Sequence, residues 1–537
     1  MFLRTILTSL LMLSLSMGWA QKPRLVVNFI VSSFRSGDIE RYSDNLTSGG
    51  FNTLTQEGLY YGKAEYNFSQ SLAPSTLSTI STGAEPSMHG VVGTTWFDYS
   101  SNNRETLIED GTIRNMPYNY DNIGFSANNL IAQTLSEALL EQSPESKSIT
   151  IAINPVEAIV VAGNSGTVLW VDPVSSQWST STAFASELPE WVANFNLKSQ
   201  PIFNRAFSSW SLSKQGADYV NSRYSDIDVS KYRNKKSLYR DSDKRLIDLN
   251  NSYNRIKYTP LGNTLVFEVA KVAIANMDIG KDNTTDIINL HLSSSGAITQ
   301  LYGRESIEVE DMLYRLDGEI MEFINYTKAQ VKGEEVLFTF TSDSGSSSSY
   351  DVNGANTAKS KRFNGVQAEV ILNGFLTARH GEGEWVLGYE NGSIYLNHNT
   401  IYQNGMSVAD IQNEIATFMM HFDGVAYALT ATSLQSSALG YGYGELVQRS
   451  FFARRSGDVL ISLLPGWIEH GDNIRSRSGS LYRYDRDVPL IFYGCGIEPL
   501  RVNQRVDMIQ FAPTLSSIME IDSPTSNQGE LLDELRK

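Results

Sequence analysis

Leu25-Val26-Val27-Asn28-Phe29-Ile30-Val31 is the stretch that decides the fold. Six of its seven residues are apolar, and four of them are β-branched. A strand that is apolar in every direction is typical of the middle of a parallel sheet, where helices cover both faces. Similar runs recur at 148–154, 286–292, 335–341 and 488–493.

Helical patterns lie between these apolar runs. Residues 129–140, 264–275 and 307–324 carry apolar side chains at helical spacing. Alternating strands and helices predict an α/β fold with a doubly wound, mostly parallel sheet and helices on both faces. Reactive groups in such folds sit at the carboxyl ends of the strands. Two polar and aromatic stretches, near 165–260 and 345–450, are predicted to be insertions that cap the sheet within one domain, 21–537.

Composition and the N-terminus restrict the class of protein. The chain has 537 residues, 41% hydrophobic and 19% charged, which is typical of a globular protein. A net charge of −16 argues against a nucleic-acid partner, because phosphate backbones require clustered Lys and Arg. Arg4, an apolar run at 6–17 and then Gly18-Trp19-Ala20 predict a secretory signal peptide, residues 1–20, cleaved after Ala20. We therefore expect a periplasmic or secreted protein without a transmembrane segment.

Several blocks then occur in a fixed order along the chain. The most informative read STGAEPSMHG at 81–90 and YDRDVPLIFYG at 484–494. Others lie at 22–27, 93–98, 187–192, 260–264 and 306–311. Together they resemble the alkaline phosphatase superfamily, in its type I phosphodiesterase/nucleotide pyrophosphatase branch. They are most similar to the periplasmic phosphate-irrepressible alkaline phosphatases of Bacteroidetes.

The resemblance implies a phosphate ester hydrolase with two zinc ions, and it indicates where the metal ligands of the family fall. These positions are Ser32, Gly296, Gln300, Asp343, Ser344 and Asp487. Only Asp343 keeps the side chain that the family pattern expects. The resemblance therefore implies that the zinc pair is lost. A single Ca²⁺ or Mg²⁺ held by Asp343 and Asp487, with Ser32 and Gln300, is the alternative.

The catalytic and phosphate-binding positions of the family are altered in the same way. The nucleophile position falls near Ser75 or Thr76, in a loop that looks shortened, and the phosphate-binding positions fall at Thr94, Asn154 and Val156. Without a base or metal to activate them, the Ser75 and Thr76 hydroxyls are predicted to cap a helix.

The histidines give an independent argument against a zinc pair. The chain has six, and none shows the paired spacing of zinc ligands. His291 lies inside an apolar run, so we expect it to be a hydrogen-bonded core residue.

The leading hypothesis is therefore a catalytically inactive pseudo-phosphatase that acts as a binding or scaffold subunit, with a protein partner in the cell envelope. The alternative is a metal-dependent phosphomonoesterase or phosphodiesterase with rebuilt metal ligands, which requires Asp343 and Asp487 to converge with residues of the insertions. A serine hydrolase is disfavoured because the sequence has no Gly-x-Ser-x-Gly elbow.

Overall fold

The computed structural model describes residues 22–117, 123–205, 210, 212–214, 218–223, 252–348, 362–471 and 474–536. The predicted signal peptide and its cleavage after Ala20 lie outside the described residues. An 11-stranded sheet forms the centre, with the order β20-β2-β19-β12-β1-β11-β8-β9-β10-β6 and with β21 paired to β2. Its strands are β1 (Leu25–Val31), β2 (Leu59–Glu65), β6 (Asn115–Met116), β8 (Ser148–Ala152), β9 (Thr167–Val171), β10 (Trp178–Ser181), β11 (Asp286–Leu292), β12 (Val336–Ser342), β19 (Asp487–Gly494), β20 (Leu500–Val502) and β21 (Val506–Asp507).

The middle of this sheet is parallel, as predicted. Strand β1 pairs in parallel with β11 on one side and with β12 on the other, and β8 and β9 continue the parallel order. Strand β19 is antiparallel to both β12 and β2. Val31 is level with Leu292 and with Ser342, so the chain leaves β1, β11 and β12 at one shared edge.

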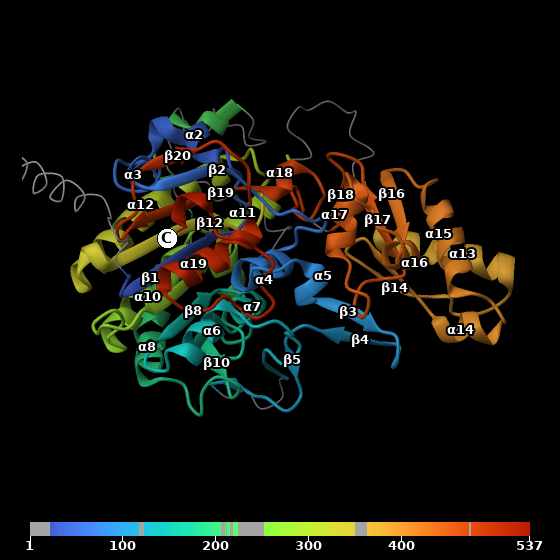
Figure 1. Ribbon diagram of the computed structural model, residues 1–537, viewed down its shortest axis with the longest axis horizontal. Coiled ribbons are helices and arrows are strands. Elements are labelled where there is room, and N and C mark those ends of the chain that lie inside the picture. The colour runs from blue at the N-terminus through green and yellow to red at the C-terminus, as the bar shows by residue number, and fades with distance from the viewer. Residues whose placement is uncertain are drawn as a thin grey trace, which may run out of the picture.

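Helices cover both faces of the sheet (Figure 1). One face packs on α8 (Glu190–Arg205), α10 (Leu261–Asn276), α11 (Ser294–Tyr302) and α12 (Ile307–Gln330), and the other on α4 (Ala73–Thr82), α6 (Leu135–Gln142), α7 (Pro155–Ala162) and α19 (Phe511–Met519). Strand β1 serves both cores: Val27 and Phe29 point to the first, Val26 and Ile30 to the second. This two-sided burial is the physical reason for its uninterrupted apolar sequence.

The predicted helix at 129–140 begins later than its periodicity suggested. Helix α6 starts at Leu135 because Thr134 forms a capping box with Glu137, which satisfies main-chain N–H groups at the helix start. Helix α12 begins at Ile307, where the Ser306 side chain accepts a hydrogen bond from the main-chain N–H of Val309.

The two predicted insertions differ in structure. Strands β9 and β10 of the first belong to the main sheet and extend its edge. The second forms a lobe with its own four-stranded sheet, ordered β14-β15-β17-β16, and its own apolar core (Figure 1). The lobe contains α13 (Gly365–His380), β14 (Val386–Glu390), β15 (Ser393–Leu396), α14 (His398–Gln403), α15 (Val408–Met419), β16 (Val425–Thr430), α16 (Ala431–Ser436), α17 (Tyr443–Ser450) and β17 (Val459–Leu463).

Shorter elements connect these parts. They are α2 (Asp38–Tyr42), α3 (Phe51–Glu57), α5 (Pro86–His89), β3 (Thr95–Asp98), β4 (Asn103–Thr106), β5 (Glu109–Asp110), β7 (Gly124–Phe125), α9 (Ser252–Lys257), β13 (Arg362–Phe363), β18 (Ile468–Glu469) and α18 (Arg483–Arg486). Within the described part of the chain, no helix has the length and apolar character needed to cross a bilayer.

Candidate functional site

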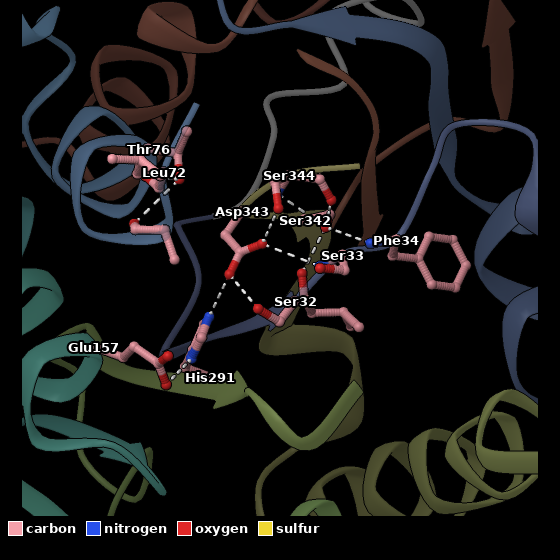
Figure 2. Close-up of polar contacts among 12 residues, drawn as sticks. Ser32, Ser33, Phe34, Leu72, Thr76, Glu157, His291, Ser342, Asp343 and Ser344 are labelled. Atoms are coloured by element: carbon pink, nitrogen blue, oxygen red, sulfur yellow. Dashed lines mark hydrogen bonds and ion pairs between the residues drawn. The ribbon is translucent and has the colours of Figure 1, made fainter. Parts of the chain in front are cut away.

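Asp343 is the centre of the polar cluster at the shared strand edge. It follows β12 directly and is completely buried. Ser32 donates its hydroxyl to Oδ2 at 2.5 Å, and the Ser33 main-chain N–H donates to Oδ1 at 3.1 Å. Ser344 donates its hydroxyl to Oδ1 at 2.8 Å. Both carboxylate oxygens are thus engaged by neighbouring strand ends (Figure 2).

His291 provides the positive charge that this carboxylate needs. Its Nε2 lies 3.1 Å from Asp343 Oδ2, and its Nδ1 lies 3.0 Å from Glu157 Oε2 of α7 (Figure 2). Burial alone would lower the pKa of the imidazole, but the charges and hydrogen bonds of Glu157 and Asp343 raise that pKa to about 10. His291 is therefore a buried imidazolium between two carboxylates.

This arrangement confirms that His291 is a hydrogen-bonded core residue, and it adds the partners that the sequence did not reveal. His291 is level with Ile30 of β1 and Ala152 of β8. Glu157 lies on the helix that follows β8, so its approach to His291 depends on the crossover between neighbouring strands. The spacing of residues along the chain carries no signal for that contact.

Gly296 closes the space beside Asp343. It lies in α11, and a Cβ atom placed there would be 2.7 Å from Ser32 Oγ and 2.8 Å from Ser32 Cβ. Contacts that short do not occur between unstrained atoms. Two of the ligand positions of the family, 32 and 296, are therefore packed directly on each other. Gln300, one turn further along α11, accepts a hydrogen bond from the Arg475 main-chain N–H on its main-chain oxygen at 2.7 Å.

Asp487 forms an ion pair with Arg505 and is not part of the Asp343 hydrogen-bond cluster. Arg505 donates to Asp487 Oδ1 at 2.7 Å and to Oδ2 at 3.3 Å, in a bidentate ion pair. The same guanidinium also donates to Glu65 at 2.9 Å. Asp487 is therefore held in an ion-pair cluster with Arg505 and Glu65. The described part of the chain does not place three or more His, Cys, Asp or Glu residues together as a metal site.

The hydroxyls near the family's nucleophile position are inside a helix, so the prediction that they cap one is wrong. Helix α4 begins at Ala73 with Leu72 as its N-cap, and Leu72 has no side chain that can cap. Thr76 donates to the main-chain oxygens of Leu72 and Ala73, both at 3.1 Å. Ser75 is 1% exposed, and its hydroxyl is buried without a hydrogen-bond partner. In Figure 2 Thr76 is turned to Leu72 and away from Asp343.

The family's phosphate-binding positions have structural roles here. Asn154 is the N-cap of α7 and accepts a hydrogen bond from the Val156 main-chain N–H at 3.0 Å. The Val156 side chain packs against the second apolar core. Thr94 is exposed, and its main-chain oxygen accepts a hydrogen bond from Leu107. None of the three supplies a positive charge.

Comparison with known proteins identifies the family of this chain. Residues 26–478 match the family model described as type I phosphodiesterase / nucleotide pyrophosphatase. The chain belongs to this family.

Relatives within the family support the fold prediction. The chain is 26% identical to alkaline phosphatase PafA of Elizabethkingia meningoseptica, over 96% of this chain and 94% of that protein. It is 27% identical to a Myroides odoratus protein named as a calcium-transporting ATPase, over 96% and 95% of the two chains. A crystal structure of wild-type alkaline phosphatase PafA has a TM-score of 0.87 to this chain at 25% identity, covering 96% of this chain and 99% of that one.

The zinc pair of this family does not fit the residues present at these positions. Zinc binds His, Cys and carboxylate ligands, yet Ser32 and Ser344 offer neutral hydroxyls and Gly296 offers no side chain. The one carboxylate next to them, Asp343, already has an imidazolium 3.1 Å away.

Proposed function

We propose that this member of the family has lost phosphate ester hydrolysis and acts as a periplasmic or secreted binding or scaffold subunit. The observation that carries the proposal is the buried ion network of Asp343, His291 and Glu157. In it, a protonated side chain of the protein supplies the charge that a metal would otherwise supply.

The packing around this network supports the same proposal. Two carboxylates without a cation would be costly to bury, whereas a paired and hydrogen-bonded imidazolium offsets that cost. The close contact of Gly296 with Ser32 leaves no room for a ligand side chain. Together these features support a site that is filled by protein atoms, in which the charge of His291 offsets part of the charge of the two carboxylates.

The test is metal content and turnover on the purified mature protein. The protein is equilibrated with zinc, freed of excess metal, and then assayed with p-nitrophenyl phosphate and bis(p-nitrophenyl) phosphate. Alkaline phosphatase PafA of Elizabethkingia meningoseptica, treated in parallel, is the positive control. We expect less than one tightly bound zinc ion per chain and no turnover above the buffer rate. Two zinc ions per chain together with turnover would favour the rebuilt hydrolase and overturn the proposal.

The proposed function includes a protein partner, and we propose that this partner binds an exposed apolar surface on α13 of the lobe. Val366 and Val370, one turn apart on α13, are 73% and 67% exposed, and Ile371 beside them is 41% exposed. Exposed apolar groups that gather on one face commonly mark interaction sites. Cross-linking in the periplasm with the wild type and with Val370→Asp tests this part. We expect a cross-linked species that the substitution abolishes; an identical cross-linking pattern in both would contradict it.

A further inference from the structure

A cleft lies between the main body and the lobe, beside α4 and α18. Its cavity volume is about 70 Å³ and its mouth is open to solvent, so it offers room for one ring-sized group and not for a larger ligand. It is separate from the ion network, because neither Asp343 nor His291 lines it. Its walls carry three aromatic side chains and a belt of hydroxyl and amide groups. The residues that decide its chemistry are Tyr389, Asn391, Trp467, Arg477, Tyr484 and Asp485.

Asp485 is the residue that indicates a ligand. It is 1% exposed and lines the cleft. Its Oδ2 accepts a hydrogen bond from the Ser480 main-chain N–H at 2.8 Å, whereas Oδ1 is buried without a hydrogen-bond partner in the described structure. An unsatisfied buried carboxylate oxygen is costly and rare in folded proteins. A ligand that donates a hydrogen bond would satisfy it.

The arginine side chains near the cleft already have hydrogen-bond or ion-pair partners within the protein. The Arg477 guanidinium lies 3.3 Å from Asn391 Oδ1 and 3.4 Å from Glu469 Oε2. Arg35, over the Tyr484 ring at 5.8 Å, donates to the Ser346 main-chain oxygen. Among the described residues that line the cleft, Arg477 is the one cation and is already paired with Glu469, whereas Asp485 Oδ1 has no partner. The cleft therefore favours a ligand without negative charge.

A row of tyrosines leads from the cleft to the surface. Tyr484 stacks on Tyr482 with ring centroids 5.6 Å apart, Tyr482 lies 6.1 Å from Tyr443, and Tyr443 lies 5.3 Å from Tyr427. Tyr443 and Tyr427 are 43% and 39% exposed. Aromatic rings with a polar edge suit ligands that are both apolar and hydrogen-bonding. A sugar ring has this character, with C–H groups on its faces and hydroxyls at its rim.

We propose that this cleft binds a neutral oligosaccharide. One sugar ring enters the cleft between Trp467 and Tyr484 and donates a hydroxyl to Asp485, and the following rings lie along the tyrosine row. A cationic amine would also satisfy Asp485, but the hydroxyl and amide belt favours a polyhydroxylated ligand. That belt consists of Ser69, Gln70, Ser347, Asn391, Ser462 and Ser478. The proposal goes beyond the loss of hydrolysis and does not depend on it.

The experiment titrates the mature full-length protein with six defined hexasaccharides: cello-, malto-, laminari-, xylo-, manno- and chitohexaose. Calorimetry measures affinity, and the part of the tryptophan fluorescence change that is lost in Trp467→Phe reports the environment of Trp467. We expect at least one hexasaccharide to bind with a Kd below ~1 mM. Because the probes carry no phosphate, their binding is read independently of the phosphatase assay.

Variants connect the binding to the cleft. Asp485→Asn is expected to weaken the affinity about tenfold at pH 8.5, where the Asp485 carboxyl is ionised, through loss of a charge-assisted hydrogen bond. Tyr443→Ala, at an exposed position that does not threaten folding, is expected to weaken the hexasaccharide more than the matching disaccharide. Tyr402→Ala, a 63% exposed tyrosine on α14 outside the cleft, is the matched control and should bind as the wild type does. Saturable binding by none of the six probes, unchanged affinity in both cleft variants, or binding of spermidine in their place would overturn the proposal.

Discussion

Replacing His291 by glutamine is the most direct perturbation of the ion network. The raised pKa of His291, from 6.5 to about 10, means that the folded state binds this proton more tightly than the unfolded state does. At pH 7 the corresponding contribution to the free energy of unfolding is ~4 kcal/mol. Removing one partner of a buried ion pair costs a similar ~3–5 kcal/mol. We expect His291→Gln to be destabilised by about that amount at pH 7.

The pH dependence makes the prediction specific. The contribution of a group with a raised pKa is fully present below its unfolded value, here 6.5, and is lost as the pH rises through its folded value, about 10. The gap between wild type and His291→Gln should therefore be largest near pH 6 and shrink as the pH approaches 10. For a chain of 537 residues, ~4 kcal/mol corresponds to a Tm difference of about 4 °C.

Differential scanning calorimetry from pH 6 to pH 10 measures this gap, with and without a metal chelator. His380→Gln is the matched control, because His380 lies 2.9 Å from a single carboxylate, that of Glu414. Adding Asp343→Asn and Glu157→Gln to His291→Gln should recover part of the loss, since the buried charges disappear together. A gap below ~1 °C, a gap that does not change with pH, or a wild-type Tm that falls on chelation would refute the reasoning.

Three further substitutions test other parts of the structure. Gly296→Ala should cost ~1–3 kcal/mol because its Cβ meets Ser32, and Ser32→Gly in the same chain should recover most of that on urea unfolding. Burial raises the pKa of Asp485 to about 7, so this group lowers the stability as the pH rises from ~4 to 7; Asp485→Asn should flatten the Tm profile over that interval. Asn154→Ala should cost ~1 kcal/mol through loss of the α7 cap, and an unchanged urea midpoint would contradict that role.

The fold could be predicted from the sequence because its central strands are buried on both faces. A run such as Leu25–Val31 is almost entirely apolar because helices pack on both faces of β1. This pattern can be recognised in the strand's own sequence, without knowing which strands pair with it. The first insertion was harder to interpret. Strands β9 and β10 are short and lie in a polar, aromatic part of the sequence, so the sequence pattern did not indicate that they belong to the main sheet.

The sequence indicated which residues lie at the strand ends, but it did not indicate which side chains contact each other there. Ser32, Asp343 and Ser344 meet because they follow β1 and β12 at one edge of the sheet. The contact of Glu157 with His291 depends on the orientation of α7, and the Asp487–Arg505 pair depends on a turn near β21. Helix α4 begins before Ser75 although Leu72 offers no cap, so Pro74 in its first turn was the one sequence signal for this helix start.

The ion network also explains why Asp343 persists where the other ligand positions have changed. Ser32, Gly296 and Ser344 are neutral and need no counter-charge, but a buried aspartate does, and His291 meets that need only if Glu157 helps to hold its proton. Under the proposed function, we expect that aspartates introduced at 32 and 296 alone do not restore metal binding. The new side chain at 296 would clash with Ser32 at the end of β1, and His291 would still lie 3.1 Å from Asp343.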